Sequence, residues 1–218
     1  MTGDEFLSFL ATRRSCRSFD GRPVPRALLE RLFEAAITAP SSTNRQPWRF
    51  AAVTAAATRA AIVDAVRRRC DEIKAIIARS HHAEDFGGYG DFFWEPLAGA
   101  PVIVVPQYRA YPDLVADLIA SGGGDPRAHH TPASMQAELA STSAAVMNLL
   151  NQAHAEGLGA CWMAGPTVAR ADISELLGIR EPWRMHGAIA LGFPDTRPAP
   201  QPRKPIAKVV TWFDEESE

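Results

Sequence analysis

Apolar residues recur at helical spacing in several separate stretches of the chain. Between Pro25 and Pro40 they return at intervals of three and four residues, which predicts a helix that the first proline opens and the second ends. The same periodicity predicts further helices over residues 4–12, 58–79, 134–156 and 169–177. In the 58–79 helix, Ile62 and Val66 fall on the face expected to be buried.

Short apolar runs separate these predicted helices. They predict strands over residues 48–54, 101–106, 187–192 and 208–212, with Trp48 in the core. The run 101–106 is far shorter than the roughly 20 apolar residues that a membrane-spanning helix needs, so no contact with a membrane is expected. Helices and strands are interspersed without a regular βαβ series or an internal repeat. This order predicts one α+β domain over residues 1–213, in which helices wrap a central sheet.

Two internal stretches are less regular than the rest. Residues 85–100 are rich in glycine and aromatic side chains, and we expect Phe92, Phe93 and Trp94 in the core, with a wall of the substrate pocket as the alternative. Residues 109–132 contain three consecutive glycines and two prolines, which predicts an excursion or lid. The acidic residues 214–218 are expected to form a disordered tail.

Composition and charge exclude several classes of protein. A net charge of −2 argues against a nucleic-acid-binding protein, which would carry a basic surplus. The N-terminus lacks the pattern of a signal peptide, and three widely spaced cysteines do not suggest disulfides or zinc, so a cytoplasmic protein is expected. The histidines at 81–82 and 129–130 are direct neighbours rather than a helical i, i+4 pair, so no metal site is expected.

The candidate chemistry begins with a basic run near the N-terminus. Arg13, Arg14, Ser15 and Arg17 combine guanidinium groups with a hydroxyl, the donors that bind phosphate oxygens. The alternative is a solvated helix end, where cations also interact favourably with the helix dipole. Further cations follow at 203–204, between two prolines, where the alternative is a solvated linker.

A second group of candidate binding residues lies between Pro40 and Trp48. Ser41, Ser42, Asn44 and Gln46 are hydrogen-bonding side chains that suit the edge of a planar ring rich in nitrogen and oxygen. Taken alone, the same residues are typical of a loop between a helix and a strand. A phosphate site together with a polar ring site indicates a mononucleotide ligand.

Four motifs, in order, resemble the nitroreductase family of FMN-dependent oxidoreductases. They are RRSCRSF from residue 13, APSSTNRQPWRF from 39, GLGACWMAGP from 157 and LGFPDTRPAPQPRKP from 191. The resemblance covers nearly the whole chain and is weakest over 85–134. It implies a nitroreductase-like fold with a mostly antiparallel central sheet. It also implies an intertwined homodimer, in which a long helix forms the interface and extended termini wrap around the partner subunit.

The resemblance also assigns roles to residues. It implies that Arg13, Ser15 and Arg203 hold the FMN phosphate with Arg14 and Lys204 nearby, and that Arg17 reaches the pyrimidine side of the flavin. The residues implied to contact the flavin of the partner subunit are Pro40, Ser41, Ser42, Asn44 and Gln46. Ala164 and Gly165 are implied to lie beside the ring, where a backbone N–H can bond to N5. Some members carry a glutamate in place of Ala164, so any ligand contact of that glutamate is in doubt here.

The implied activity is transfer of electrons from NADH or NADPH through flavin N5 to a small, planar, electrophilic acceptor such as a nitroaromatic or a quinone. The cofactor carries this chemistry, so no general acid or base is required of the protein. The alternatives are the other reactions of the fold, namely reductive dehalogenation, dehydrogenation and flavin fragmentation. A flavin-binding protein without turnover, serving storage or sensing, is a further alternative.

Overall fold

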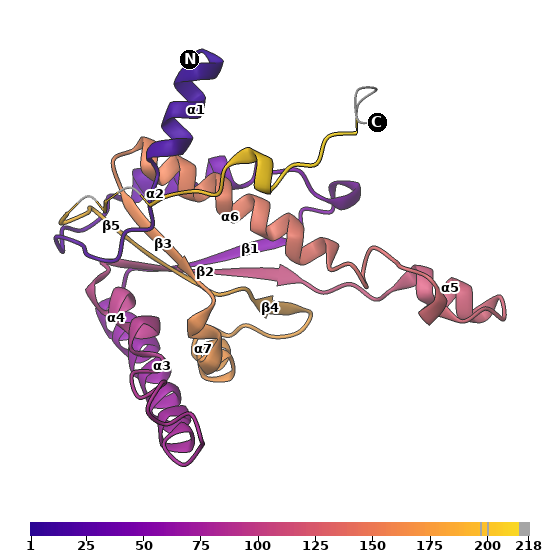
Figure 1. The fold of residues 1–218 in the computed structure, drawn as a ribbon. Helices are drawn as coiled ribbons and strands as arrows, with labels where there is room; N and C mark the ends of the chain where they lie inside the picture. Colours follow the sequence, from indigo (N-terminus) through magenta and orange to yellow (C-terminus); the bar gives the residue numbers. More distant parts are fainter. Residues whose placement is uncertain (197, 200, 214–218) are drawn as a thin grey trace.

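A five-stranded sheet in which every pairing is antiparallel forms the centre of the molecule. The structure, a computed structural model, describes residues 1–196, 198–199 and 201–213 (Figure 1). The strand order is β1-β2-β5-β3, and β4 pairs with the far end of β2. The strands are β1 (Trp48–Val53), β2 (Val102–Arg109), β3 (Gly159–Met163), β4 (Trp183–Met185) and β5 (Ala188–Gly192).

Helices cover both faces of this sheet, as Figure 1 shows. One face packs against α2 (Arg26–Ala36) and α6 (Ala137–Ala155). The other packs against α3 (Ala56–Ile77), α4 (Asp91–Gly99) and α7 (Arg170–Leu177). The remaining helices are α1 (Gly3–Thr12) and α5 (Leu114–Ser121), with short 3-10 turns η1 (Ser42–Asn44), η2 (Pro126–Ala128), η3 (Gly165–Ala169) and η4 (Ile206–Lys208).

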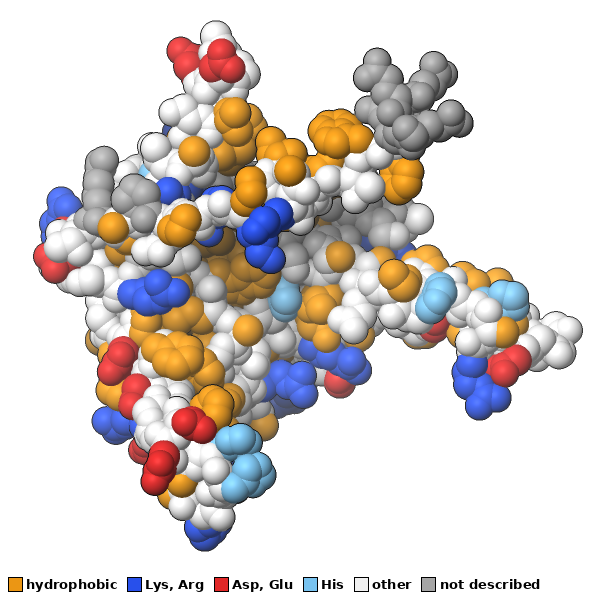
Figure 2. All heavy atoms as spheres, in the orientation of Figure 1, with side chains coloured by type: hydrophobic (Ala, Val, Ile, Leu, Met, Phe, Trp, Pro, Cys, Tyr) orange, Lys and Arg blue, Asp and Glu red, His pale blue; other side chains and the backbone are white. Residues whose placement is uncertain are grey.

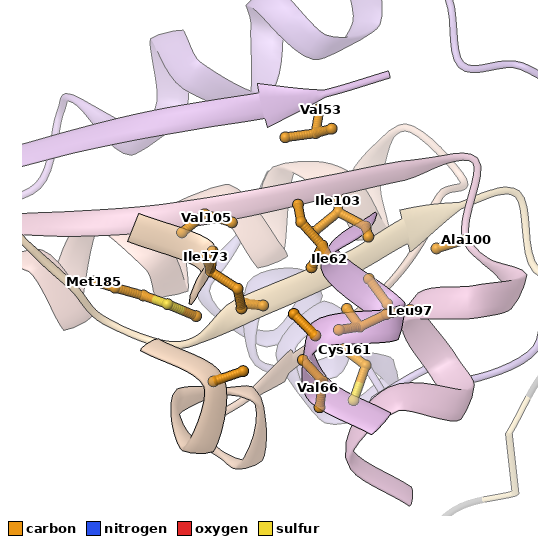
Figure 3. Close-up of a cluster of buried hydrophobic side chains, with 14 of the residues drawn as sticks. Val53, Ile62, Val66, Leu97, Ala100, Ile103, Val105, Cys161, Ile173 and Met185 are labelled. Atoms are coloured by element: carbon orange, nitrogen blue, oxygen red, sulfur yellow. The ribbon is translucent and has the colours of Figure 1, made fainter. Parts of the chain in front are cut away.

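Strand β2 is buried on both faces and divides the core into two layers. Val102 and Val104 point into the α2–α6 layer, whereas Ile103 and Val105 point into the other layer, as successive side chains of a strand must. Figure 3 shows Ile103 and Val105 packed with side chains from the helices of that second layer. This double burial explains why the sequence of the strand is continuously apolar instead of alternating.

Three segments extend away from the two-layered body (Figure 1). Helix α1 buries none of its residues, and Leu7 is 67% exposed. Helix α5 forms an arm on which Leu114 and Leu118 are exposed. Residues 201–213 cross the surface near α6, and Trp212 is 69% exposed. The segment 109–132 is thus an excursion that contains a helix, and its role as a lid stays a prediction.

The structure confirms the predicted α+β class and its mostly antiparallel sheet, as well as the buried position of Trp48. The predicted strand over 208–212 is wrong, because this segment pairs with no strand among the described residues and instead holds the end of η4 and an exposed stretch. Phe92 is 59% exposed, so its prediction as a core residue is also wrong, whereas Phe93 and Trp94 pack partly buried against the core. The predicted tail 214–218 lies outside the described residues.

Helices long and apolar enough to cross a membrane are absent from the part of the chain that the structure describes. Strand β4 and helix α4 were not predicted. Helix α4 contains Pro96, which normally marks a helix end, and begins after Gly90 in a left-handed conformation.

Candidate functional site

The segment that follows α1 runs alongside β3 and is fixed there by backbone contacts. Ser15 forms a parallel bridge with Ala160, and the Cys16 amide donates to the Ala160 carbonyl oxygen at 3.0 Å. The buried Cys16 side chain lies against Gly159, where an added Cβ would come within 2.7 Å of it, so this position requires glycine. Because side chains alternate along an extended segment, Ser15 and Arg17 face away from Cys16, and both are exposed.

The side chains of Arg13, Ser15 and Arg17 share one side of this segment, over Cys161 of β3. Burial raises the pKa of the Cys161 thiol, while the nearby Arg17 charge, a hydrogen bond with Ser15 and the Arg13 charge act in the opposite direction. The thiol therefore stays neutral at physiological pH, and it forms a small buried surface beneath these three side chains. Three of the residues predicted to bind the cofactor thus lie together.

Arg203, near the other end of the chain, lies close enough to Arg13 for the two charges to interact. The pKa of Arg13 is lowered, first by burial of its guanidinium and then by the positive charges of Arg203 and Arg14. Among the described residues, neither Arg13 nor Arg203 forms an ion pair with a carboxylate. Like charges held together without a counter-ion oppose folding, and a bound dianion would remove that cost. The pair therefore fits the FMN phosphate that the resemblance implies.

Arg14 is placed differently. Its Nη1 donates to the carbonyl oxygen of Arg13 at 2.7 Å and also to that of Ala11, so it satisfies carbonyl groups at the end of α1. Arg14 and Cys16 line a separate cavity of about 290 Å³, whose lining includes neither Arg13 nor Ser15. This geometry gives Arg14 a role in shaping the segment, and its contact with phosphate stays a prediction. Lys204 is exposed beside Arg203, and its role likewise stays a prediction.

The loop before β1 has an unusual backbone. Thr43, Asn44 and Gln46 have φ angles of 51°, 53° and 48°, in the left-handed region that non-glycine residues rarely adopt. Such conformations cost on the order of 1–3 kcal/mol each and persist only where neighbouring contacts impose them. Inside the loop, Ser41 Oγ accepts from the Gln46 amide at 3.0 Å, and Gln46 Nε2 donates to Asn44 Oδ1 at 3.3 Å.

Helix α6 holds this loop from outside. The Ser42 amide donates to Ser141 Oγ at 3.3 Å, and Arg45 forms an ion pair of 2.9 Å with the buried Glu138. The loop presents Pro40, Asn44 and Gln46 as exposed groups and Ser41 and Ser42 as half-buried ones. Within the described ranges, no hydrogen bond or ion pair joins it to Arg13, Ser15 or Arg203. The loop residues therefore form a group separate from Arg13, Ser15 and Arg203.

The end of β3 carries the remaining predicted residues. The Ala164 carbonyl oxygen accepts from the Thr167 amide at 2.9 Å and from the Thr167 hydroxyl at 2.7 Å, which turns the chain into η3. Gly165 lies directly under the ring of Phe93, because a Cβ at 165 would come within 2.2 Å of that ring. Phe93 contacts the exposed Phe92 edge to face, with ring centroids 4.5 Å apart.

Sequence reasoning named Phe93 as a core residue or pocket wall without its contact to Gly165, and it missed the supporting residues Ser141 and Glu138. The aromatic richness of residues 85–100 was a visible signal for Phe93, but nothing local indicated which backbone it would cover. Ser141 and Glu138 gave no signal, because they lie on a helix far along the chain from the loop that they hold.

Comparison with known proteins identifies the family of this chain and its relatives. The sequence profile of the nitroreductase family matches residues 10–193. An NADH dehydrogenase of Thermus thermophilus is 28% identical over 203 residues, covering 92% of each chain.

Two solved structures are similar in fold. One is a BluB-like flavoprotein from Clostridium difficile, with a TM-score of 0.83 at 22% identity, covering 96% of this chain and 99% of the other. The other is an iodotyrosine deiodinase bound to FMN and 3-iodo-L-tyrosine, with a TM-score of 0.71 at 20% identity, covering 95% and 98%.

Proposed function

Because this chain belongs to the nitroreductase family, we propose that it is an FMN-dependent oxidoreductase that uses NADH or NADPH to reduce a small, planar, electrophilic acceptor such as a nitroaromatic or a quinone. When bound, FMN would accept a hydride at N5 and pass electrons onward. The relatives support the donor and the cofactor: one is named as an NADH dehydrogenase, and a structural neighbour is bound to FMN.

The observation that carries this proposal is the grouping of Arg13, Ser15 and Arg17 beside β3, with the charge of Arg203 close enough to act on Arg13. Neither Arg13 nor Arg203 has a carboxylate partner among the described residues. Two guanidinium groups can donate several charge-assisted hydrogen bonds to a phosphate, and Ser15 adds a hydroxyl beside them. The two arginines come from opposite ends of the chain, so phosphate binding would also fasten the C-terminal segment to the body.

Arg17 and the backbone at Gly165 would hold the ring of the cofactor. Arg17 lies over Cys161, and its exposed guanidinium can stabilise the negative charge that reduction places near N1 and O2. Gly165 lacks a side chain where the Phe93 ring packs, and its backbone would lie beside the flavin ring as the resemblance implies. Phe93 fixes that backbone from the other side.

We propose that the second group of residues, in the loop before β1, completes the site of a partner subunit in a homodimer. Exposed apolar side chains on α1 and on the C-terminal segment support an interface of this kind. Figure 2 shows such side chains gathered on these two projections, and Leu7, Val209 and Trp212 are among them.

Anaerobic stopped-flow mixing tests the activity. We expect NADH or NADPH to bleach the flavin absorbance of the FMN-loaded protein, and a nitroaromatic or a quinone to restore it. Flavin that stays oxidised in the presence of both donors would instead support a binding or storage protein. A related deiodinase supports reductive dehalogenation as the second candidate. Halide release from a halogenated aromatic, faster than reduction of nitroaromatics or quinones, would favour that reaction.

A further inference from the structure

A second polar pocket lies where the ends of β2 and β4 meet the first turn of α6. Its volume is about 320 Å³, and its lining includes Tyr108, Tyr111, Gln136, Glu138 and Arg184. The volume is at the lower end of the range for small-molecule sites and is large enough for one substituted aromatic ring. None of its lining residues was predicted to bind the cofactor.

The pocket adjoins the loop proposed to reach the flavin of the partner. Arg45 of that loop pairs with Glu138 at 2.9 Å, and its guanidinium carbon lies 4.9 Å from the centre of the Tyr111 ring. Glu138 is 7% exposed and is neutralised by this partner. A ligand seated here would therefore lie next to the flavin-contacting loop.

Three arginines lie in or beside the pocket. Arg109 approaches the Tyr111 ring to 5.0 Å, and Arg184 Nε donates to Glu181 at 3.1 Å. Arg184 lines the pocket, whereas Arg45 and Arg109 lie against the Tyr111 ring of its wall. Glu138 pairs with Arg45, and Glu181 pairs with Arg184.

A carboxylate of a ligand could replace Glu181 as the partner of Arg184. The Glu181 side chain is 70% exposed, and exposed pairs of this kind contribute little. The pKa of Arg184 is raised, first by the hydrogen bond with Glu181 and then by one with Tyr108, so the Tyr108 hydroxyl lies within reach of the same guanidinium. An incoming carboxylate could bind Arg184 bidentately and accept a hydrogen bond from Tyr108.

We propose that this pocket selects aromatic acceptors that carry a carboxylate, with Arg184 and Tyr108 binding the carboxylate. This inference rests on the proposed oxidoreductase function and names the class of its acceptor. Tyrosine rings supply a large, rigid contact surface for such a ligand. The reducing electrons come from NADH or NADPH, as in the proposed reaction.

The test compares 4-nitrobenzoate with its neutral analogue 4-nitrobenzamide as acceptors for the FMN-loaded protein. The kcat/KM value for 4-nitrobenzoate divided by that for 4-nitrobenzamide measures how well the protein recognises the carboxylate. Changes in flavin content cancel from this ratio. We expect Arg184→Gln to lower this ratio about tenfold, the effect of losing one charge-assisted contact. Tyr108→Phe should lower it severalfold. The matched control is Arg79→Gln, which removes an exposed arginine on the far end of the α3 region and should leave the ratio unchanged.

An unchanged ratio in both Arg184→Gln and Tyr108→Phe would overturn the inference while leaving the oxidoreductase function intact. Failure of the proposed function is a separate result, in which the wild-type flavin is not reduced by either donor. In that case titration calorimetry measures whether the protein binds 4-nitrobenzoate. Binding that Arg184→Gln weakens supports the pocket, whereas absent or unaltered binding rejects it.

Discussion

Two arginines that repel each other are the most informative residues of this protein. Arg13 and Arg203 have no carboxylate partner in the described part of the chain, and the lowered pKa of Arg13 reflects burial first and then the neighbouring positive charges. An isolated protein gains nothing from this arrangement. A protein that binds a phosphate gains both affinity and attachment of its C-terminal segment.

Gly165 gives a prediction at the scale of single residues. Replacement by alanine would place a Cβ 2.2 Å from the Phe93 ring. We expect Gly165→Ala to destabilise the fold by roughly 1–3 kcal/mol through overpacking and to weaken FMN binding by displacing this backbone. Thermal unfolding followed by circular dichroism, together with a flavin titration, measures both effects.

Gly99→Ala is the matched control, since nothing lies within 4 Å of a Cβ at that position. It should leave stability unchanged or raise it by up to about 1 kcal/mol. Adding Phe93→Leu to Gly165→Ala should recover part of the lost stability. A Gly165→Ala protein with the melting temperature of the wild type would show that Phe93 does not constrain this position.

The helices whose apolar residues recur with a strong period were predicted well, whereas elements without such a period were not. Helices α2, α3 and α6 bury one face against the sheet, so their apolar residues must return every three or four positions. Strand β4 has three residues, too few to show a pattern. The apolar residues over 208–212 resemble a strand, but they face no neighbouring strand, and sequence alone cannot tell an exposed apolar segment from a buried one.

The attachment of α7 to α3 gives a prediction that depends on pH. Arg69 donates to both carboxylate oxygens of Asp172, at 2.9 and 3.2 Å, and this hydrogen bonding lowers the pKa of Asp172 below its ordinary value of 3.8. The stabilisation is therefore complete above about pH 4 and is lost as the pH falls through the lower pKa of the folded state.

We expect Asp172→Asn to lower the melting temperature by a few degrees at pH 7 and by progressively less below pH 4. Asp71→Asn is a suitable control, because that exposed carboxylate on α3 lies 4.0 Å from its nearest cation, Lys74. A difference between wild type and Asp172→Asn that stays constant down to pH 2 would show that the ion pair does not link the two helices.

At the scale of the whole molecule, the sequence indicated which residues form the site more readily than how they come together in space. The types of Arg13, Ser15 and Arg203 indicated a phosphate site, and the family resemblance supplied their roles. Their meeting depends on how α1 and the C-terminal segment cross the body, which no local pattern encodes. The pocket around Arg184 was invisible in the sequence for the same reason, since β2, β4 and α6 each contribute to it.

The exposed projections predict association. We expect the protein to sediment as a dimer of twice 23.7 kDa. Trp212→Glu should shift the equilibrium towards monomer, because it places a charge on a segment proposed to lie in the interface. Ile76→Glu, on the exposed side of α3, is the control and should leave the dimer intact. A monomer in the wild type at micromolar concentration would contradict the proposal that one chain completes the site of another.

The most direct test of the account compares the affinity of the protein for FMN with that for riboflavin, which lacks the phosphate. The wild type should bind FMN at least tenfold more tightly. Arg203→Ala should weaken FMN binding by roughly 1.5–3 kcal/mol while leaving riboflavin binding unchanged, and Lys208→Ala should alter neither. Equal affinity of the wild type for the two flavins, or no binding of either, would contradict the claim that Arg13 and Arg203 meet to hold a phosphate.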